Sequence, residues 1–137
     1  MGGMETEDSH NTAVVVADNR ETVLQAVSTT LEKAGFTILA ASSGAQAVRC
    51  CRESSHPVNL AIIDSAAGIN VPELVGQLDA ISPGMRTLFL TDFEAEESLR
   101  VVPTSGHIRG FLRKPFRRAQ LLGQVLEMMD RPMVLTA

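Results

Sequence analysis

Four polar side chains stand where short apolar runs of the sequence end, and their chemistry is complementary. Two are carboxylates, one is a hydroxyl and one is an ammonium: Asp18, Asp64, Thr91 and Lys114. An aspartate carboxylate can act as a nucleophile that forms an aspartyl phosphate. Catalysis of such a transfer is mostly positioning and electrostatic stabilisation of the phosphoryl oxygens. Brought together, the four residues would accept a phosphoryl group on Asp64.

The other three residues have roles that suit this chemistry. Mg²⁺ is held by one or two carboxylates plus waters, so Asp18 and Asp64 are its candidate ligands. Lys114 would pair with one phosphate oxygen as a point charge, and Thr91 would donate to another. Each residue also has a structural interpretation: Asp18 as a helix cap, Thr91 as a strand residue and Lys114 as surface charge. Four such residues at four strand ends favour the functional interpretation.

The elements that must position these residues alternate five times along the chain. Short, continuously apolar runs predict buried strands, and they occupy residues 12–18, 36–41, 58–64, 86–92 and 106–112. Apolar residues at helical spacing predict helices that begin near residues 19, 42, 70, 94 and 116. Asn70 and Glu73 form a candidate capping box, with Pro72 in the first turn. The fifth strand has the weakest pattern because it contains a glycine.

Alternation of apolar strands with helices predicts an α/β fold with a parallel sheet covered on both faces. In such a sheet, ligands bind outside the carboxyl ends of the strands, where the winding direction reverses. Asp18, Asp64 and Thr91 stand at the ends of the first, third and fourth predicted strands, and Lys114 closely follows the fifth. We therefore expect these four residues to face one crevice.

Composition is consistent with one soluble domain. The chain has 137 residues, of which 45% are hydrophobic and 20% are charged, and no apolar run approaches the length of a membrane span. We expect a tail at 1–11, either disordered or an expression remnant, a domain at 12–130 and a C-terminal tail at 131–137. The net charge of −4 gives no support for a nucleic-acid surface. The adjacent Cys50 and Cys51 do not form a disulfide framework, which favours a reducing cytoplasm.

The chain resembles the receiver domains of response regulators in two-component signalling. The stretches that carry the resemblance are VVVADN at 14–19, LAIID at 60–64, LFLTD at 88–92 and FLRKPF at 111–116. The resemblance covers about residues 13–129. It implies a flavodoxin-like, doubly wound parallel sheet of five strands in the order 2-1-3-4-5, and a phosphoacceptor in a phosphorelay rather than an enzyme.

The resemblance also implies roles for individual residues and a cis bond between Lys114 and Pro115. The implied phosphorylation site is Asp64, the Mg²⁺ ligands are Asp18, Asp64 and the backbone carbonyl of Ala66, the phosphate-pairing lysine is Lys114, and the switch residues are Thr91 and Phe111. The implied partner is a histidine kinase or phosphotransfer domain. The fourth helix, fifth strand and fifth helix would form the face read by partners, and this face also allows a homodimer. Neither nucleic-acid binding nor membrane insertion is implied, and a segment of a hybrid sensor kinase is one form the chain could take.

Four positions depart from the family pattern. Ala17 stands where the first of two adjacent acidic residues is usual, which should weaken but not abolish Mg²⁺ binding. The loop after Asp64, SAAGINVP, lacks the usual Met-Pro and Asp-Gly elements. Asp92 stands where a small residue is usual, and we expect its charge to slow phosphorylation and hydrolysis. Phe111 lacks the hydroxyl of the tyrosine that is common at this position. Its sequence context fits an ordinary core phenylalanine as well as it fits a switch residue.

Three alternatives remain at this stage. A receiver-like interaction module without phosphotransfer is favoured by Ala17, Asp92 and the altered loop, and opposed by the four retained polar residues. An enzyme of the haloacid dehalogenase type would need a second Asp where Ala66 stands. A flavin protein is disfavoured because the chain has no Trp or Tyr to stack on the ring and no phosphate-cradling loop after the first strand.

Overall fold

A computed structural model describes residues 12–65, 69–103 and 108–130 of the chain. Its five parallel strands are ordered β2-β1-β3-β4-β5, which confirms the predicted fold class. The strands are β1 (Ala13–Ala17), β2 (Thr37–Ala41), β3 (Val58–Asp64), β4 (Arg86–Thr91) and β5 (Arg109–Arg113). The helices are α2 (Glu21–Lys33), α3 (Gly44–Glu53), α4 (Val71–Ile81), α5 (Phe93–Arg100) and α6 (Arg118–Asp130). Over the described residues, no helix is both long and apolar enough to cross a bilayer.

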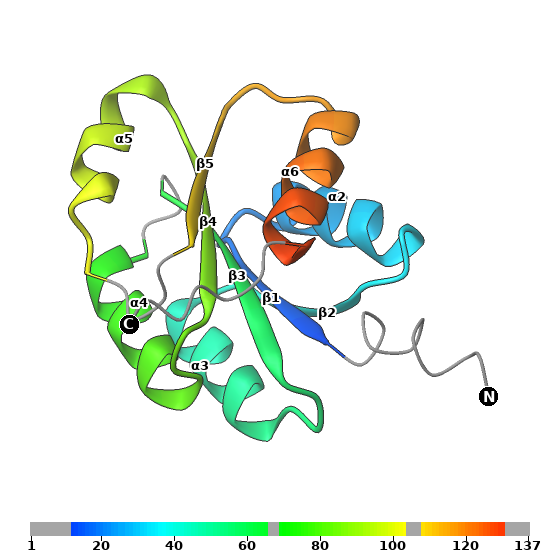
Figure 1. Ribbon diagram of the computed structural model, residues 1–137, viewed down its shortest axis with the longest axis vertical. Helices are drawn as coiled ribbons and strands as arrows, with labels where there is room; N and C mark the ends of the chain where they lie inside the picture. The colour runs from blue at the N-terminus through cyan, green and yellow to red at the C-terminus, as the bar shows by residue number, and fades with distance from the viewer. Residues whose placement is uncertain (1–11, 66–68, 104–107, 131–137) are drawn as a thin grey trace.

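Helices cover both faces of the sheet, because successive side chains of a strand point to opposite sides. Val14 and Val16 of β1 belong to the core beneath α2 and α6, whereas Val15 belongs to the core beneath α3, α4 and α5. Figure 1 shows the two helices on one side of the sheet and the three on the other. The two cores explain why the strands are apolar throughout rather than alternating.

Helix starts differ slightly from the sequence prediction, and the caps give the reason. The helix expected from Asn19 begins at Glu21, because Arg20 is its N-cap and has an extended backbone. The helix expected near Phe116 begins at Arg118, and the side chain of Gln120 accepts a hydrogen bond from the Arg117 amide just before it. Local backbone conformation at Arg20 and a local hydrogen bond at Arg117 accompany these boundaries, which apolar spacing alone misplaces.

The two middle helices α3 and α4 are capped by side-chain oxygens. Ser43 caps α3 by accepting from the Gln46 amide, and Asn70 caps α4 by accepting from the Glu73 amide. Asn70 therefore forms the predicted side-chain cap. An oxygen at the N-cap satisfies one of the amides that have no partner within the helix.

Gly110 explains the weak pattern of the fifth strand. A Cβ atom at this position would lie 2.8 Å from the side-chain nitrogen of Gln124 and 2.8 Å from the sulfur of Met128. Both contacts are shorter than real Cβ atoms make, so glycine lets α6 pack directly against β5.

Candidate functional site

Asp64 ends β3 at the carboxyl edge of the sheet and is fully buried, with its side chain 0% exposed. The Nζ atom of Lys114 lies 2.9 Å from its Oδ1 and 3.1 Å from its Oδ2. Lys114 follows β5, and its backbone amide donates to the carbonyl of Thr91 on β4 at 2.8 Å. The Lys114–Pro115 bond is cis, as the resemblance implied. The third and fifth strands thus bring a carboxylate and an ammonium into direct contact.

Asp18 follows β1 and is also buried, with its side chain 2% exposed. Its backbone amide donates to the carbonyl of Ala41 at 3.1 Å, which continues the pairing of β1 with β2. Its Oδ1 accepts from the backbone amide of Arg20 at 2.9 Å. Asp18 is therefore held by its own strand–helix turn, although Arg20 and not Asp18 is the N-cap of α2.

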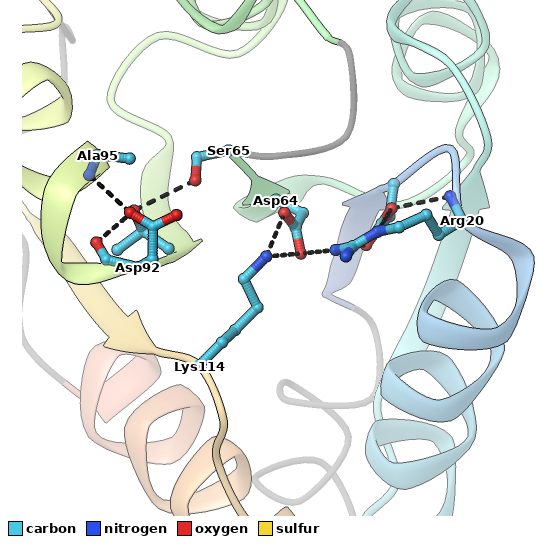
Figure 2. A network of polar contacts seen from close by, with 8 residues as sticks. Arg20, Asp64, Ser65, Asp92, Ala95 and Lys114 are labelled. Atoms are coloured by element: carbon cyan, nitrogen blue, oxygen red, sulfur yellow. Dashed lines mark hydrogen bonds and ion pairs between the residues drawn. The ribbon is translucent and has the colours of Figure 1, made fainter.

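Arg20 joins the two carboxylates. Its Nε and one terminal nitrogen each lie 3.2 Å from an oxygen of Asp18, and that terminal nitrogen also donates to Asp64. Figure 2 shows Arg20 and Lys114 reaching Asp64 from opposite sides. Chiefly the hydrogen bond to Asp18 raises the pKa of Arg20, so the guanidinium stays charged. The buried pair of carboxylates thus has two cations as partners.

Thr91 ends β4 next to Asp64 and is fully buried. Its hydroxyl accepts from Ser65 Oγ at 3.2 Å and donates to the carbonyl of Asp92 at 3.1 Å. Asp92 itself caps α5, because its Oδ1 accepts from the Ala95 amide at 2.7 Å. The carboxylate that we expected to repel a phosphodonor therefore also has a structural role at the start of α5 (Figure 2).

Phe111 is half-buried on β5, on the side of the sheet that α5 covers. Its ring stacks on Phe89 with centroids 5.5 Å apart, and the guanidinium of Arg100 lies over it at 4.6 Å. Arg100 also pairs with Glu96, which pairs with Arg113 at 2.9 Å. Arg109 donates to the carbonyl of Arg100 at 2.8 Å. Of these arginines, Arg100 and Arg113 are therefore paired with a carboxylate, and Arg109 is bound to a backbone oxygen.

The residues present fit Mg²⁺ in their donor chemistry, because buried carboxylate oxygens are the ligands that a hard cation prefers. Asp18 and Asp64 are the described residues that would hold it. Ala66, whose carbonyl the resemblance adds as a ligand, lies outside the described residues, as do the tails at 1–11 and 131–137. Among the described residues no cluster of three or more His, Cys, Asp or Glu could hold a metal ion, and the weaker Mg²⁺ binding expected from Ala17 stays a prediction.

Sequence reasoning missed Arg20 and Ser65. The polar residues at the strand ends are two carboxylates, a hydroxyl and an ammonium, whereas Arg20 and Ser65 lie in the turns that follow the strands. Arg20 lies two positions after Asp18, in the turn between β1 and α2, and Ser65 directly follows Asp64. The same rule, that the carboxyl ends of parallel strands share one edge, would have drawn attention to both.

Comparison with known proteins identifies the family. The sequence pattern of the response regulator receiver domain matches residues 14–126. A CheY-like receiver domain protein from Methanospirillum hungatei is similar in structure, with 20% identity, a TM-score of 0.73 and coverage of 87% of this chain and 94% of that one. Chemotaxis response regulator CheY4 of Vibrio cholerae has 23% identity, a TM-score of 0.72 and coverage of 85% and 98%.

The receiver domain of the hybrid histidine kinase CckA is similar to the same degree, with 19% identity, a TM-score of 0.70 and coverage of 86% and 99%. A search of curated proteins found no match. At these identities the solved structures support the fold, and the sequence pattern supports the family. The chain belongs to the response regulator receiver domains, which are signalling domains of two-component systems.

Proposed function

We propose that this receiver domain accepts a phosphoryl group on Asp64 from a histidine kinase or a phosphotransfer domain in the cytoplasm. The observation that carries the proposal is the contact between the buried Asp64 carboxylate and Lys114 Nζ at 2.9 and 3.1 Å. A lysine so placed can remain paired with the site when the carboxylate becomes an acyl phosphate. The domain would act as a phosphoacceptor rather than as an enzyme with a separate substrate.

The transfer itself needs little from the protein beyond positioning. An oxygen of Asp64 forms a bond to phosphorus, the bond between phosphorus and the donor's leaving atom breaks, and water later hydrolyses the acyl phosphate. Lys114 would hold one phosphoryl oxygen by a charge-assisted hydrogen bond. Asp18, Asp64 and the Ala66 carbonyl would hold Mg²⁺, and the bound metal would supply positive charge that offsets the charge of the phosphoryl group.

The phosphate would be read at the face formed by α5, β5 and α6. It adds about −1.5 to −2 charge, and the Thr91 hydroxyl would leave the Asp92 carbonyl to donate to it. Phe111, which lies between Phe89 and Arg100, would repack when β4 and α5 shift. A local charge change would thereby bias an element with two arrangements. The same face is the proposed surface for a homodimer.

A second function is favoured by specific residues: an interaction module of the same fold with impaired phosphotransfer. Ala17 removes one carboxylate from the usual acidic pair, and the guanidinium of Arg20 contacts both of the carboxylates that remain. Both features disfavour a divalent cation at Asp64. The two functions predict different results for a single labelling experiment.

That experiment is intact-protein mass spectrometry after incubation with acetyl phosphate and Mg²⁺. We expect the wild type to gain one phosphate and Asp64→Asn to gain none. Asp79→Asn, a carboxylate on α4, is the matched control and should be labelled like the wild type. Absence of labelling at millimolar acetyl phosphate over hours would contradict phosphotransfer and support the interaction module.

A further inference from the structure

The side chain of Arg20 is available to the site because it has no capping role. Arg20 is the N-cap of α2, where Ser, Thr, Asp or Asn would usually cap with a side-chain oxygen, and its own side chain makes no capping bond. Its backbone is extended, with φ −95° and ψ 110°, and its amide is tied to Asp18. The guanidinium is therefore directed back over the strand end instead of along the helix.

The guanidinium contacts oxygens of both carboxylates that could hold a metal. It donates to both oxygens of Asp18 and to Oδ2 of Asp64. Two buried carboxylates close to one another need positive charge, because neighbouring like charges in a low-dielectric site repel strongly. Lys114 pairs with Asp64, and Arg20 is the cation shared by both. It thus supplies charge where a divalent cation would supply it.

We propose that Arg20 is the resident counter-cation of the Asp18–Asp64 pair and competes with Mg²⁺ for it, so that one side chain sets the metal affinity of this receiver domain. The inference rests on the proposed function in that Mg²⁺ is taken as the cofactor of Asp64. Mg²⁺ lies about 2.0–2.1 Å from its oxygen ligands and would need the same oxygens that the guanidinium uses. Metal binding would therefore require Arg20 to leave.

The side chain of Arg20 is in partial contact with solvent, unlike the two carboxylates that it binds. Its side chain is 41% exposed, whereas the side chains of Asp18 and Asp64 are 2% and 0% exposed. A partly solvated guanidinium can exchange its carboxylate partners for water, but the two carboxylates cannot do the same. The carboxylates would thus always keep a cation, either the guanidinium or the metal, and the arginine would alternate between bound and solvated positions.

Isothermal titration calorimetry with MgCl₂ tests the competition on the full chain. We expect Arg20→Ala to bind Mg²⁺ at least about tenfold more tightly than the wild type, a change of about 1.4 kcal/mol. Arg20→Lys keeps the charge but loses the planar fork that engages two carboxylates, so its affinity should be intermediate. The double variant Arg20→Ala/Asp18→Asn should lose the gain. Arg52→Ala, at an exposed arginine in the last turn of α3, makes the same change in net charge and should bind like the wild type.

Thermal unfolding followed by circular dichroism gives a second readout that does not depend on phosphorylation. A ligand that binds only the folded state stabilises it according to its concentration and affinity. Without metal, Arg20→Ala should melt below the wild type because its carboxylates lose a partner. MgCl₂ should raise the Tm of Arg20→Ala by more than that of the wild type. If Arg20→Ala requires metal to fold, that dependence itself supports the proposal.

Equal Mg²⁺ affinity in the wild type and Arg20→Ala would overturn the inference, and so would failure of both to bind. An equal gain in Arg52→Ala would overturn it too, because net charge would then explain the effect. These outcomes are separate from those of acetyl phosphate labelling. A wild type that is never labelled, together with tighter metal binding by Arg20→Ala, would refute the proposed function and leave this inference standing.

Discussion

Asp64 and Glu96 are each held between two cations, but they lie in very different surroundings. Asp64 is fully buried at the end of β3 and contacts Arg20 and Lys114. Glu96 lies on α5 with its side chain 10% exposed, and contacts Arg100 and Arg113, whose side chains are 58% and 54% exposed. The same arrangement of charges therefore occurs once around a fully buried carboxylate, whose cations are 41% and 24% exposed, and once around a slightly exposed carboxylate whose cations are more than half exposed.

The difference in depth should decide what each arrangement does. A buried carboxylate that loses a cation has no water to replace it, so its pairing affects stability and reactivity together. Surface ion pairs contribute little because solvent and salt screen them. We infer that the Asp64 cluster supports chemistry, whereas the Glu96 cluster orients α5 against β5 at low energetic cost.

The largest expected effect comes from removing one cation beside Asp64, compared with removing one cation beside Glu96. Lys114→Met keeps the length of the side chain and removes the charge beside Asp64, and should lower the free energy of unfolding by about 2 kcal/mol, because Arg20 remains as a partner. Arg100→Met, the matched change beside Glu96, should cost less than about 1 kcal/mol. Urea denaturation followed by circular dichroism measures both. Equal losses would show that burial does not distinguish the clusters.

Each cluster includes a cation from the end of β5, Arg113 beside Glu96 and Lys114 beside Asp64, and Gly110 lies on the same strand. Gly110→Ala introduces a methyl group between β5 and α6 where Gln124 and Met128 already lie at 2.8 Å. Both atoms are the far ends of flexible side chains that can shift, so this overpacking should destabilise the domain by about 1 kcal/mol, the lower end for such changes, and should slow labelling of Asp64 to the extent that β5 is displaced.

Gly123→Ala is the control for this change. It lies on α6 with nothing within 4 Å of the added methyl group, and alanine is a better helix former than glycine, so stability should rise by about 0.5–1 kcal/mol. Similar effects of the two variants in urea denaturation would mean that β5 and α6 do not pack as closely as the distances indicate.

The contrast between the clusters also shows what sequence could and could not predict. The five strands, their two-sided burial and the meeting of Asp64 with Lys114 follow from apolar runs and from the geometry of parallel sheets, which are local patterns and a general rule. Arg20 does not follow from either. Its role depends on an extended N-cap that turns a surface-type residue back over two buried carboxylates, and such a reach is decided by tertiary contacts.

Near Glu96 the sequence shows the charged residues but not their pairing. Five arginines in this part of the sequence indicated a basic surface: Arg100, Arg109, Arg113, Arg117 and Arg118. Glu96 neutralises two of them, and Arg109 is used on carbonyls of Leu99 and Arg100. A composition of charges cannot show which of them are paired. The packing role of Gly110 could not be predicted either, because it depends on tertiary contacts with Gln124 and Met128.

Asp92 lies between the two clusters in the sequence. It directly follows Thr91 and caps α5, the helix that carries Glu96. Asp92→Asn removes the charge and keeps the capping oxygen, whereas Asp92→Ala removes both and should cost about 1 kcal/mol of stability. If the charge repels a phosphodonor, both variants should be labelled by acetyl phosphate faster than the wild type. Labelling rates by mass spectrometry and stability by urea denaturation separate the two effects.

A faster rate in Asp92→Ala alone would assign the effect to loosening of α5 instead of to charge. Unchanged rates in both variants would contradict the proposed repulsion, and Asp92 would then be a helix cap only.

The smallest expected effect concerns the pH dependence of the Glu96 cluster. Hydrogen bonds from Arg113 first, and then from Arg100, lower the pKa of Glu96 below its ordinary value of 4.5. Because the pKa is depressed in the folded state, the pairing stabilises the fold above pH 4.5 and loses this contribution as pH falls through the folded-state pKa.

Glu96→Gln should therefore match the wild type at acidic pH and be slightly less stable near neutral pH. Urea denaturation across this range checks the sign, since a stability difference that grows on acidification is incompatible with pairing of an ionised Glu96. The exposure of both arginines limits the effect, and high salt should reduce it further, which gives an independent measure of how far this face differs from the buried site at Asp64.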